Sequence, residues 1–357
     1  MGHPRTRWPR IACGESAGAS GAPTPPTRLS PAARRLCPWL RRAGLIAGAL
    51  AGLGLGWTGL SSARAAARFP ARGSWAEVEG ARLHLLDLGP RSERAIVLLH
   101  GAFGNSGEWP AELIEGLVGA GRRVLVPDRP GHGWSERPEP DLSLASQARL
   151  LQGAVAAAGV ERITLCGFSF GGAVALAWAL ERPAGVEAVV LLNAPSHPWR
   201  SGYPGSYDLL AAPGIGPLCA QLAAGALGSL SRDASVAKAF APEPVAAGFL
   251  ERAALALALR PRDLVHNARD IRRLEPDLEA LVPRYGELRM PIVSLVSTDD
   301  QVVSPTIHSL PLAAAVAGLE RIEIPGAGHQ LPWTRPLEIA ARILDVAARA
   351  ESSAAER

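Results

Sequence analysis

Five short runs of apolar residues, separated by stretches long enough for helices, constrain the fold of this chain most. The runs are Ala95–Leu99, Val124–Val126, Ile163–Cys166, Ala188–Leu192 and Ile292–Val296. Continuous apolar runs of this length predict strands that are covered on both faces, as in a parallel sheet. One further run, Arg82–Asp87, alternates between polar and apolar residues and predicts a half-exposed strand.

Helices are expected between these runs. The predicted helices are Glu108–Ala120, Leu144–Ala158, Gly171–Glu181 and Pro336–Ala348, and a short strand over Arg321–Ile324 precedes the last of them. Alternation of strand and helix predicts an α/β fold with a doubly wound, mostly parallel sheet.

One interval interrupts the alternation. About 100 residues separate Leu192 from Ile292, and a structureless loop of that length is rare in a compact domain. The interval is rich in leucine and alanine at helical spacing and is broken by prolines. We therefore expect residues 75–195 and 287–350 to form the core and residues 351–357 a tail. Residues 196–286 are expected to form a helical cap over the carboxyl edge of the sheet, where open parallel sheets bind ligands.

The charge of the chain is unevenly distributed. Residues 1–72 hold 11 Arg, no Lys and one acid, which leaves 26 bases and 32 acids in the rest. A mildly acidic body is not expected to bind nucleic acid, because protein surfaces that bind the negatively charged phosphate backbone are strongly basic. The four cysteines lack Cys-x-x-Cys or Cys/His spacing, which argues against a zinc site or a disulfide framework. No metal and no organic cofactor are expected.

The amino-terminal part indicates export or membrane anchoring. Residues 1–42 are rich in Pro, Gly, Ala, Ser and Arg, and we predict a disordered basic leader there. Residues 43–60 carry no charge and would span about 27 Å as a helix, close to the hydrocarbon thickness of a bilayer. The segment Ser61–Ala65 resembles a signal cleavage site. The arginines that precede the apolar segment, Arg34, Arg35, Arg41 and Arg42, are expected on the cytoplasmic side.

Two outcomes follow from this segment. It is either a membrane anchor with the body outside the cytoplasm, or a signal that is cleaved during export. Glycines recur at every fourth position on one helix face, at Gly44, Gly48, Gly52 and Gly56. Such a face lets two membrane helices approach closely and predicts a dimer contact, although an Ala/Gly-rich segment also produces this spacing by chance.

A nucleophile is predicted at the end of the third apolar run. Gly167-Phe168-Ser169-Phe170-Gly171 lies between Ile163–Cys166 and a predicted helix. A serine flanked by glycines between a strand and a helix is typical of the nucleophile elbow, a sharp turn that exposes the hydroxyl at the strand end. We therefore predict that Ser169 is the nucleophile.

A serine hydroxyl is a weak nucleophile at neutral pH and needs a base. His329, within Gly326-Ala327-Gly328-His329-Gln330, follows the short predicted strand and precedes the last helix. A neutral imidazole at this position can accept the serine proton and return it to the leaving group. We predict His329 as this base.

The acid that orients the imidazole is expected just after the run Ile292–Val296. Two adjacent acids, Asp299 and Asp300, lie there. Side chains of neighbours in an extended loop point apart, so only one of them can face His329. The other available strand end carries Asn193, which supplies no negative charge.

Backbone N–H groups are expected to stabilise the transition-state charge. The N–H of Phe170, directly after the nucleophile, is one candidate. The second is expected in the loop after Ala95–Leu99, from Ala102 or, as the alternative, from Phe103. His100 is expected to order this loop. We also predict that Phe103 and Phe168 line an apolar substrate pocket.

These residues resemble the α/β-hydrolase superfamily over about Trp75 to Ala348. The matching segments occur in the family's order, namely His100-Gly101, Asp128–Ser135, the Ser169 turn, the Asp300 loop and Gly328-His329. The resemblance implies that Asp300 is the acid of the triad, that Asp299 is a solvated loop residue and that Asp128 is structural. Ser297 stands where the family usually has a glycine.

The resemblance is to the lidded serine esterase and lipase-like branch. Haloalkane dehalogenases and epoxide hydrolases use Asp as the nucleophile, and the loop 100–107 lacks the Gly-Pro-Gly of the carbon–carbon bond hydrolases. The expected activity is hydrolysis of a small-molecule carboxylic ester with an apolar acyl group through an acyl-enzyme. Thioesterase, lactonase, amidase, acyltransferase or perhydrolase activity on the same residues is an alternative, as is a non-catalytic, membrane-tethered binding protein.

Overall fold

The computed structural model describes residues 31–199, 202 and 204–355. It begins with one long helix, α1 (Pro31–Arg68). Disorder was predicted over residues 1–42, and this prediction is wrong for residues 31–42, while residues 1–30 lie outside the described residues. Ala, Leu and Arg are strong helix formers, so the helix extends from the apolar segment in both directions.

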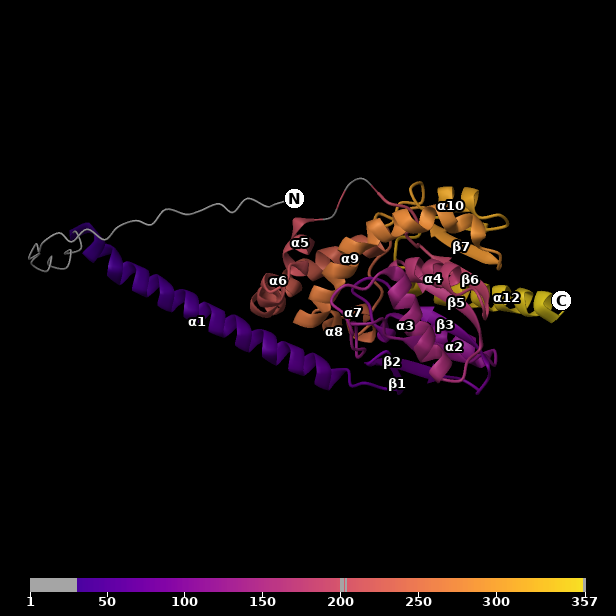
Figure 1. Cartoon of the computed structure of the whole chain (residues 1–357), viewed down its shortest axis with the longest axis horizontal. Helices are drawn as coiled ribbons and strands as arrows, with labels where there is room; N and C mark the ends of the chain where they lie inside the picture. Colours follow the sequence, from indigo (N-terminus) through magenta and orange to yellow (C-terminus); the bar gives the residue numbers. More distant parts are fainter. Residues whose placement is uncertain (1–30, 200–201, 203, 356–357) are drawn as a thin grey trace, which may run out of the picture. The chain divides into compact units, whose positions relative to one another are not determined.

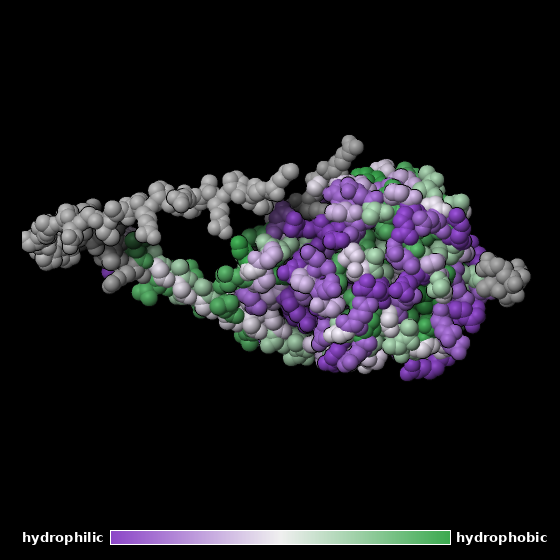
Figure 2. Space-filling model, in the orientation of Figure 1, coloured by the Kyte–Doolittle hydropathy of each residue, from purple (hydrophilic) through white to green (hydrophobic). Residues whose placement is uncertain are grey.

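Within α1, the stretch Arg42–Arg68 is long and apolar enough to cross a membrane, with 27 residues. The helix runs through the predicted cleavage segment at residues 61–65. Large apolar side chains along it are exposed, among them Leu45, Ile46 and Leu53. Figure 2 shows apolar residues along this helix and many polar residues on the visible face of the body.

The core is a sheet of eight strands in the order β1-β2-β4-β3-β5-β6-β7-β8 (Figure 1). The strands are β1 (Ser74–Val78), β2 (Ala81–Leu88), β3 (Arg94–Leu99), β4 (Val124–Pro127), β5 (Arg162–Phe168), β6 (Val186–Leu192), β7 (Ile292–Ser297) and β8 (Glu320–Ile324). The pairs β1–β2 and β2–β4 are antiparallel and the remaining pairs are parallel. The predicted fold class is therefore confirmed. Strand β1 was not predicted, because its sequence SWAEV is mostly exposed at the edge of the sheet.

Helices cover both faces of the sheet because successive strand residues point to opposite sides. In β3, Val97 packs into one core cluster and Leu98 into the other. Helices α3 (Leu144–Ala157) and α4 (Phe170–Glu181) supply the first cluster, and α2 (Ala111–Gly119) and α12 (Pro336–Ala355) the second. Helix α12 is longer than predicted and includes the first residues of the predicted tail, residues 351–355.

The interval between β6 and β7 contains the predicted helices. They are α5 (Gly205–Ala211), α6 (Ile215–Phe240), α7 (Phe249–Arg252), α8 (Leu255–Ala258) and α9 (Pro261–Leu281), followed by the 3-10 helix η2 (Val282–Glu287). Helix α9 begins with a proline, which fits the first turn because its missing N–H would have no partner there. After β7 come the short helices α10 (Ser309–Ala315) and α11 (Leu331–Thr334), and after β3 comes the 3-10 helix η1 (Ser106–Glu108).

Candidate active site

Ser169 lies in the sharp turn between β5 and α4. Its φ of 51° and ψ of −125° are a strained conformation that a non-glycine residue adopts when its surroundings hold it there. The turn is possible because its neighbours are glycines. A Cβ on Gly167 would lie 2.4 Å from the carbonyl oxygen of Gly171, and a Cβ on Gly171 would lie 2.1 Å from that of Leu99.

The structure brings the three predicted triad residues together. The Ser169 Oγ lies 3.0 Å from His329 Nε2, and His329 Nδ1 lies 2.7 Å from Asp300 Oδ2. All three side chains are nearly covered, with Ser169 9% and His329 5% exposed. The carboxylate of Asp300 also accepts the N–H groups of Val302 and Val303 at 2.7 and 2.9 Å, which fixes its orientation.

The neighbouring acid faces elsewhere. Asp299 is exposed, and its Oδ2 accepts the hydroxyl of Thr298 at 2.8 Å. The structure therefore resolves which of the two acids meets His329.

Asn193 is a site residue whose position the sequence did not explain. Its Nδ2 donates to the carbonyl of His329 at 2.9 Å and to Ser297 Oγ at 2.9 Å, and its Oδ1 accepts the Ser297 N–H at 2.8 Å. It thus joins the ends of β6 and β7 to the loop that carries His329. Its place at a strand end was the available signal, but the contact itself is a product of the sheet order.

Phe168 does not line a pocket as predicted. The side chain is 1% exposed in the core, and its ring lies 5.1 Å from the imidazole of His329, centroid to centroid. A residue at the last position of a central strand points into a covered face of the sheet. Phe103, by contrast, is partly exposed, and its ring lies 6.3 Å from that of Tyr207 in the cap.

We use the term oxyanion loop for residues 100–105. Phe103 donates its N–H to Asn267 Oδ1 at 2.8 Å, so this N–H is already in use. Among the described residues no acceptor is recorded for the N–H of Ala102. Phe170 is the first residue of α4, and the first N–H groups of a helix have no acceptor within it. The N–H groups of Ala102 and Phe170 are therefore available as donors to a bound ligand.

His100 holds the oxyanion loop from within. Its Nε2 accepts the N–H of Arg129 at 2.9 Å, and its Nδ1 donates to the Gly101 carbonyl at 2.9 Å. Burial and the Arg129 charge lower the pKa of His100 well below its usual value, so it stays neutral. The imidazole of His100 is thus neutral, and both of its nitrogens form hydrogen bonds that order the loop, as expected from the sequence.

A buried acid near the site was missed. Glu108 Oε2 accepts the Gly101 N–H at 2.6 Å, and burial raises the pKa of this carboxyl to about 7. No motif pointed to it, because a glutamate before a tryptophan is unremarkable in a sequence. Among the described residues, no group of three or more His, Cys, Asp or Glu is arranged to hold a metal ion.

A family profile described as alpha/beta hydrolase fold matches residues 94–336, more than half of the chain. The chain belongs to the alpha/beta hydrolase fold family. The 2-hydroxy-6-oxo-6-phenylhexa-2,4-dienoate hydrolase of Burkholderia cepacia is 28% identical over 256 residues, which cover 71% of this chain and 86% of that protein.

Two other similarities are narrower or more distant. An uncharacterized protein of Mycobacterium tuberculosis is 34% identical over 100 residues, so the match spans 28% of this chain and only 29% of that relative. A solved structure of a bacterial membrane phospholipase A superposes with a TM-score of 0.60 at 19% identity, over 89% of this chain and 99% of that one. At this identity the likeness shows the fold alone.

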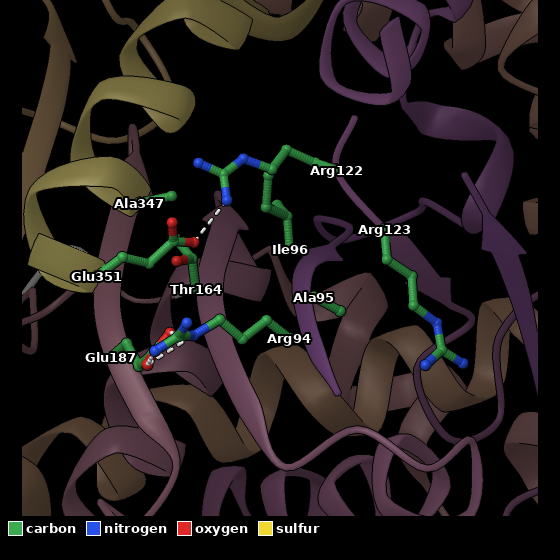
Figure 3. A pocket seen from close by; sticks show the side chains of 9 residues that line it. All are labelled: Arg94, Ala95, Ile96, Arg122, Arg123, Thr164, Glu187, Ala347 and Glu351. Atoms are coloured by element: carbon green, nitrogen blue, oxygen red, sulfur yellow. Dashed lines mark hydrogen bonds and ion pairs between the residues drawn. The ribbon is translucent and has the colours of Figure 1, made fainter. Parts of the chain in front are cut away.

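In this alpha/beta hydrolase the opposite, amino-terminal edge of the sheet holds a different kind of cavity (Figure 3). Its volume of about 20 Å³ suits roughly one water molecule. Two of its guanidinium groups are paired with carboxylates, Arg94 with Glu187 at 3.0 Å and Arg122 with Glu351 at 2.6 Å. These ion pairs leave no room for an organic substrate.

A larger opening of about 530 Å³ lies between the loop after β6 and the carboxyl end of α9. Its lining residues are His197, Pro198, Glu275, Glu279, Val282, Pro283 and Ile307. Ser169 is not among them.

Proposed function

We propose that the protein is a serine hydrolase that cleaves carboxylic esters through an acyl-enzyme. The observation that carries this proposal is the continuous hydrogen-bond chain from Ser169 Oγ through His329 to Asp300, at 3.0 and 2.7 Å. Such a chain lets the histidine take the proton of the serine as it attacks. Backbone N–H donors beside the serine then stabilise the oxyanion.

The proposed reaction has two halves. Ser169 Oγ attacks the ester carbonyl while His329 Nε2 takes its proton, and Asp300 stabilises the imidazolium. The N–H groups of Phe170 and Ala102 bind the oxyanion. The imidazolium then protonates the leaving alcohol as the ester C–O bond breaks. Water, deprotonated by His329, attacks the acyl-enzyme, and the carboxylic acid leaves as Ser169 regains its proton.

An apolar acyl group is the proposed substrate feature. Phe103 and Tyr207 meet where the cap covers the oxyanion loop, and the cap is rich in leucine and alanine. Apolar side chains at a covered site favour an apolar ligand by removing its surface from water.

The direct test is Ser169→Ala. This variant is expected to lose hydrolysis of short-chain 4-nitrophenyl esters by at least about 10⁴-fold and to lose labelling by a fluorophosphonate probe. Ser353→Ala, at an exposed serine on α12, serves as the matched control and should retain both. Unchanged turnover in Ser169→Ala would overturn the proposal.

A second candidate is hydrolysis of a carbon–carbon bond. It is favoured by the relative from Burkholderia cepacia, a 2-hydroxy-6-oxo-6-phenylhexa-2,4-dienoate hydrolase, whereas the absence of Gly-Pro-Gly from the loop 100–107 favours the ester. A panel of alkyl esters, thioesters, lactones and that dienoate separates the candidates. Faster turnover of the dienoate than of every ester would replace the first proposal.

We also propose that α1 anchors the protein with its body outside the cytoplasm. The exposed apolar side chains of α1 and the arginines before residue 43 support this orientation. The full chain is expected to stay with the membrane fraction after a high-salt wash. Release in soluble form would favour cleavage instead. Dimerisation through Gly44, Gly48, Gly52 and Gly56 remains a prediction, which cross-linking in membranes would test.

A further inference from the structure

One buried guanidinium touches both segments that carry the expected oxyanion donors. Arg129 Nε donates to the His100 carbonyl at 3.2 Å, and its Nη2 donates to the Gly101 carbonyl at 3.1 Å. The same group lies over the ring of Phe170, 4.3 Å from the centroid. The position of Arg129 therefore affects the oxyanion loop and the start of α4 together.

Arg129 is itself oriented by an acid of the cap. Asp270 on α9 is 1% exposed, and its Oδ2 accepts Arg129 Nη1 and His132 Nε2, both at 2.9 Å. Its Oδ1 accepts Arg137 Nη1 at 2.9 Å. Burial raises the pKa of Asp270, but Arg137, His132 and Arg129 together hold it well below its usual value. The carboxylate is thus charged, and its hydrogen bonds with Arg129, His132 and Arg137 fix its position, so that it can orient the guanidinium of Arg129.

A second residue of α9, Asn267, contacts the oxyanion loop directly at Phe103. Asn267 lies one turn before Asp270, is 1% exposed and accepts the N–H of Phe103 at 2.8 Å. Phe103 has a φ of 55°, which an aromatic residue adopts only when its surroundings impose it. By engaging this N–H, Asn267 stabilises the turn that leaves the N–H of Ala102 free.

We propose that cap helix α9 holds the backbone donors of the oxyanion hole in place, and that Asn267 and Asp270 act as positioning residues. Asn267 sets the oxyanion loop directly, and Asp270 sets that loop and Phe170 through Arg129. The proposal rests on the function proposed above. It implies that α9 stays on the sheet during turnover, because a displacement of about 1 Å in a catalytic donor can cost about 100-fold in rate.

The first test does not depend on activity. Hydrogen–deuterium exchange is measured on peptides that cover residues 100–105 in the full chain. Asn267→Leu removes the acceptor and is expected to raise exchange of the loop about fivefold, the effect of losing one hydrogen bond of typical strength. Asn267→Asp keeps an acceptor oxygen and is expected to restore the protection. Unchanged exchange in Asn267→Leu would overturn the proposal.

The matched control is further along the same helix. Glu279 is exposed on α9, more than three turns after Asn267, and it lines the opening beside η2. Glu279→Gln is expected to leave exchange of residues 100–105 and ester turnover unchanged. Loosening of the loop in this variant would show that any change in α9 has that effect, and would contradict a specific role for Asn267.

The second test separates positioning from folding. Active sites are counted with a fluorophosphonate, and kcat is expressed per titrated site. Asn267→Leu is expected to lower this kcat about 10- to 100-fold, as for a misplaced oxyanion donor, with KM within about threefold. Asp270→Asn is expected to lower kcat in the same sense. Fewer titratable sites with full kcat per site would indicate a folding role alone and overturn the proposal.

The outcomes also separate the two proposals. A wild-type chain that neither reacts with the fluorophosphonate nor cleaves esters would overturn the proposed function. The exchange measurement would still decide whether Asn267 holds the loop.

Discussion

Two buried histidine–aspartate pairs in this hydrolase have almost the same geometry and different partners. His329 Nδ1 lies 2.7 Å from Asp300 Oδ2, and His84 Nδ1 lies 2.8 Å from Asp128 Oδ2. The other ring nitrogen decides the difference. In His329 it faces the hydroxyl of Ser169, whereas in His84 it contacts the carbonyl of Arg72.

A carbonyl can only accept a hydrogen bond, so both nitrogens of His84 must donate. Burial lowers the pKa of His84, but Asp128 and the Arg72 carbonyl outweigh it and raise the pKa above its usual value. A ring with two bound protons has no lone pair to take a proton. The serine hydroxyl beside His329 can donate, which leaves that ring free to be a base. A His–Asp pair is therefore not evidence of a catalytic site until the second nitrogen is examined.

The largest predicted effect concerns the acid of the first pair. In Asp300→Asn, the amide oxygen can still accept the N–H groups of Val302 and Val303, so the amide nitrogen faces His329. The imidazole must then accept at Nδ1 and carries its proton on Nε2, the wrong nitrogen for a base. We expect kcat for ester hydrolysis to fall about 10⁴-fold, measured per titrated site. A fall in kcat of less than tenfold would contradict the proposed difference in role between the two histidine–aspartate pairs.

The next prediction uses a buried acid without a histidine partner. The pKa of Glu108 is raised to about 7 from a usual 4.5. Its stability contribution is therefore fully present below pH 4.5 and lost as the pH rises through 7, by about 3 kcal/mol. Urea unfolding from pH 4.5 to 7.5 should show wild type losing stability relative to Glu108→Gln. A constant difference across this range would contradict the raised pKa.

The second pair is expected to affect folding and not turnover. His84→Gln removes a partner of the buried Asp128 carboxylate and should lower the free energy of unfolding by about 1–3 kcal/mol. Because the pKa of His84 is raised, this difference should be present below pH 6.5 and decrease as the pH rises above it. Ester kcat should stay within about threefold of wild type. A loss of activity without loss of stability would show that the two pairs are not functionally distinct.

The smallest predicted effect is at Asp299, the neighbour of the proposed catalytic acid. Asp299 is exposed and faces Thr298, so Asp299→Asn should change kcat by less than about twofold and unfolding free energy by less than about 0.5 kcal/mol. Paired with Asp300→Asn, it tests the assignment of the acid between two adjacent residues. A large loss of kcat in Asp299→Asn would reverse that assignment.

Local patterns in the sequence were enough to predict the sheet, most helices and the positions of Ser169 and His329. An apolar run indicates a buried strand by its own composition, so this signal can be read from a short stretch of sequence. The turn at Ser169 needs small residues within three positions, so its signature is also local. Chain order then places the serine, acid and histidine at strand ends on one edge of a parallel sheet.

Contacts between distant residues could not be predicted in this way. Asp300 and Asp299 are equivalent in local pattern, and only the path of the loop after β7 turns one of them toward His329. Phe168 was predicted to line a pocket, but the folded sheet buries its side chain in the core. Asn267 meets Phe103 from 164 positions away in the chain, and Asp270 meets Arg129 from 141. Such pairs depend on how the cap docks on the sheet, which is decided by the summed packing of many side chains. No short stretch of sequence encodes that sum, so it was settled only in the tertiary structure.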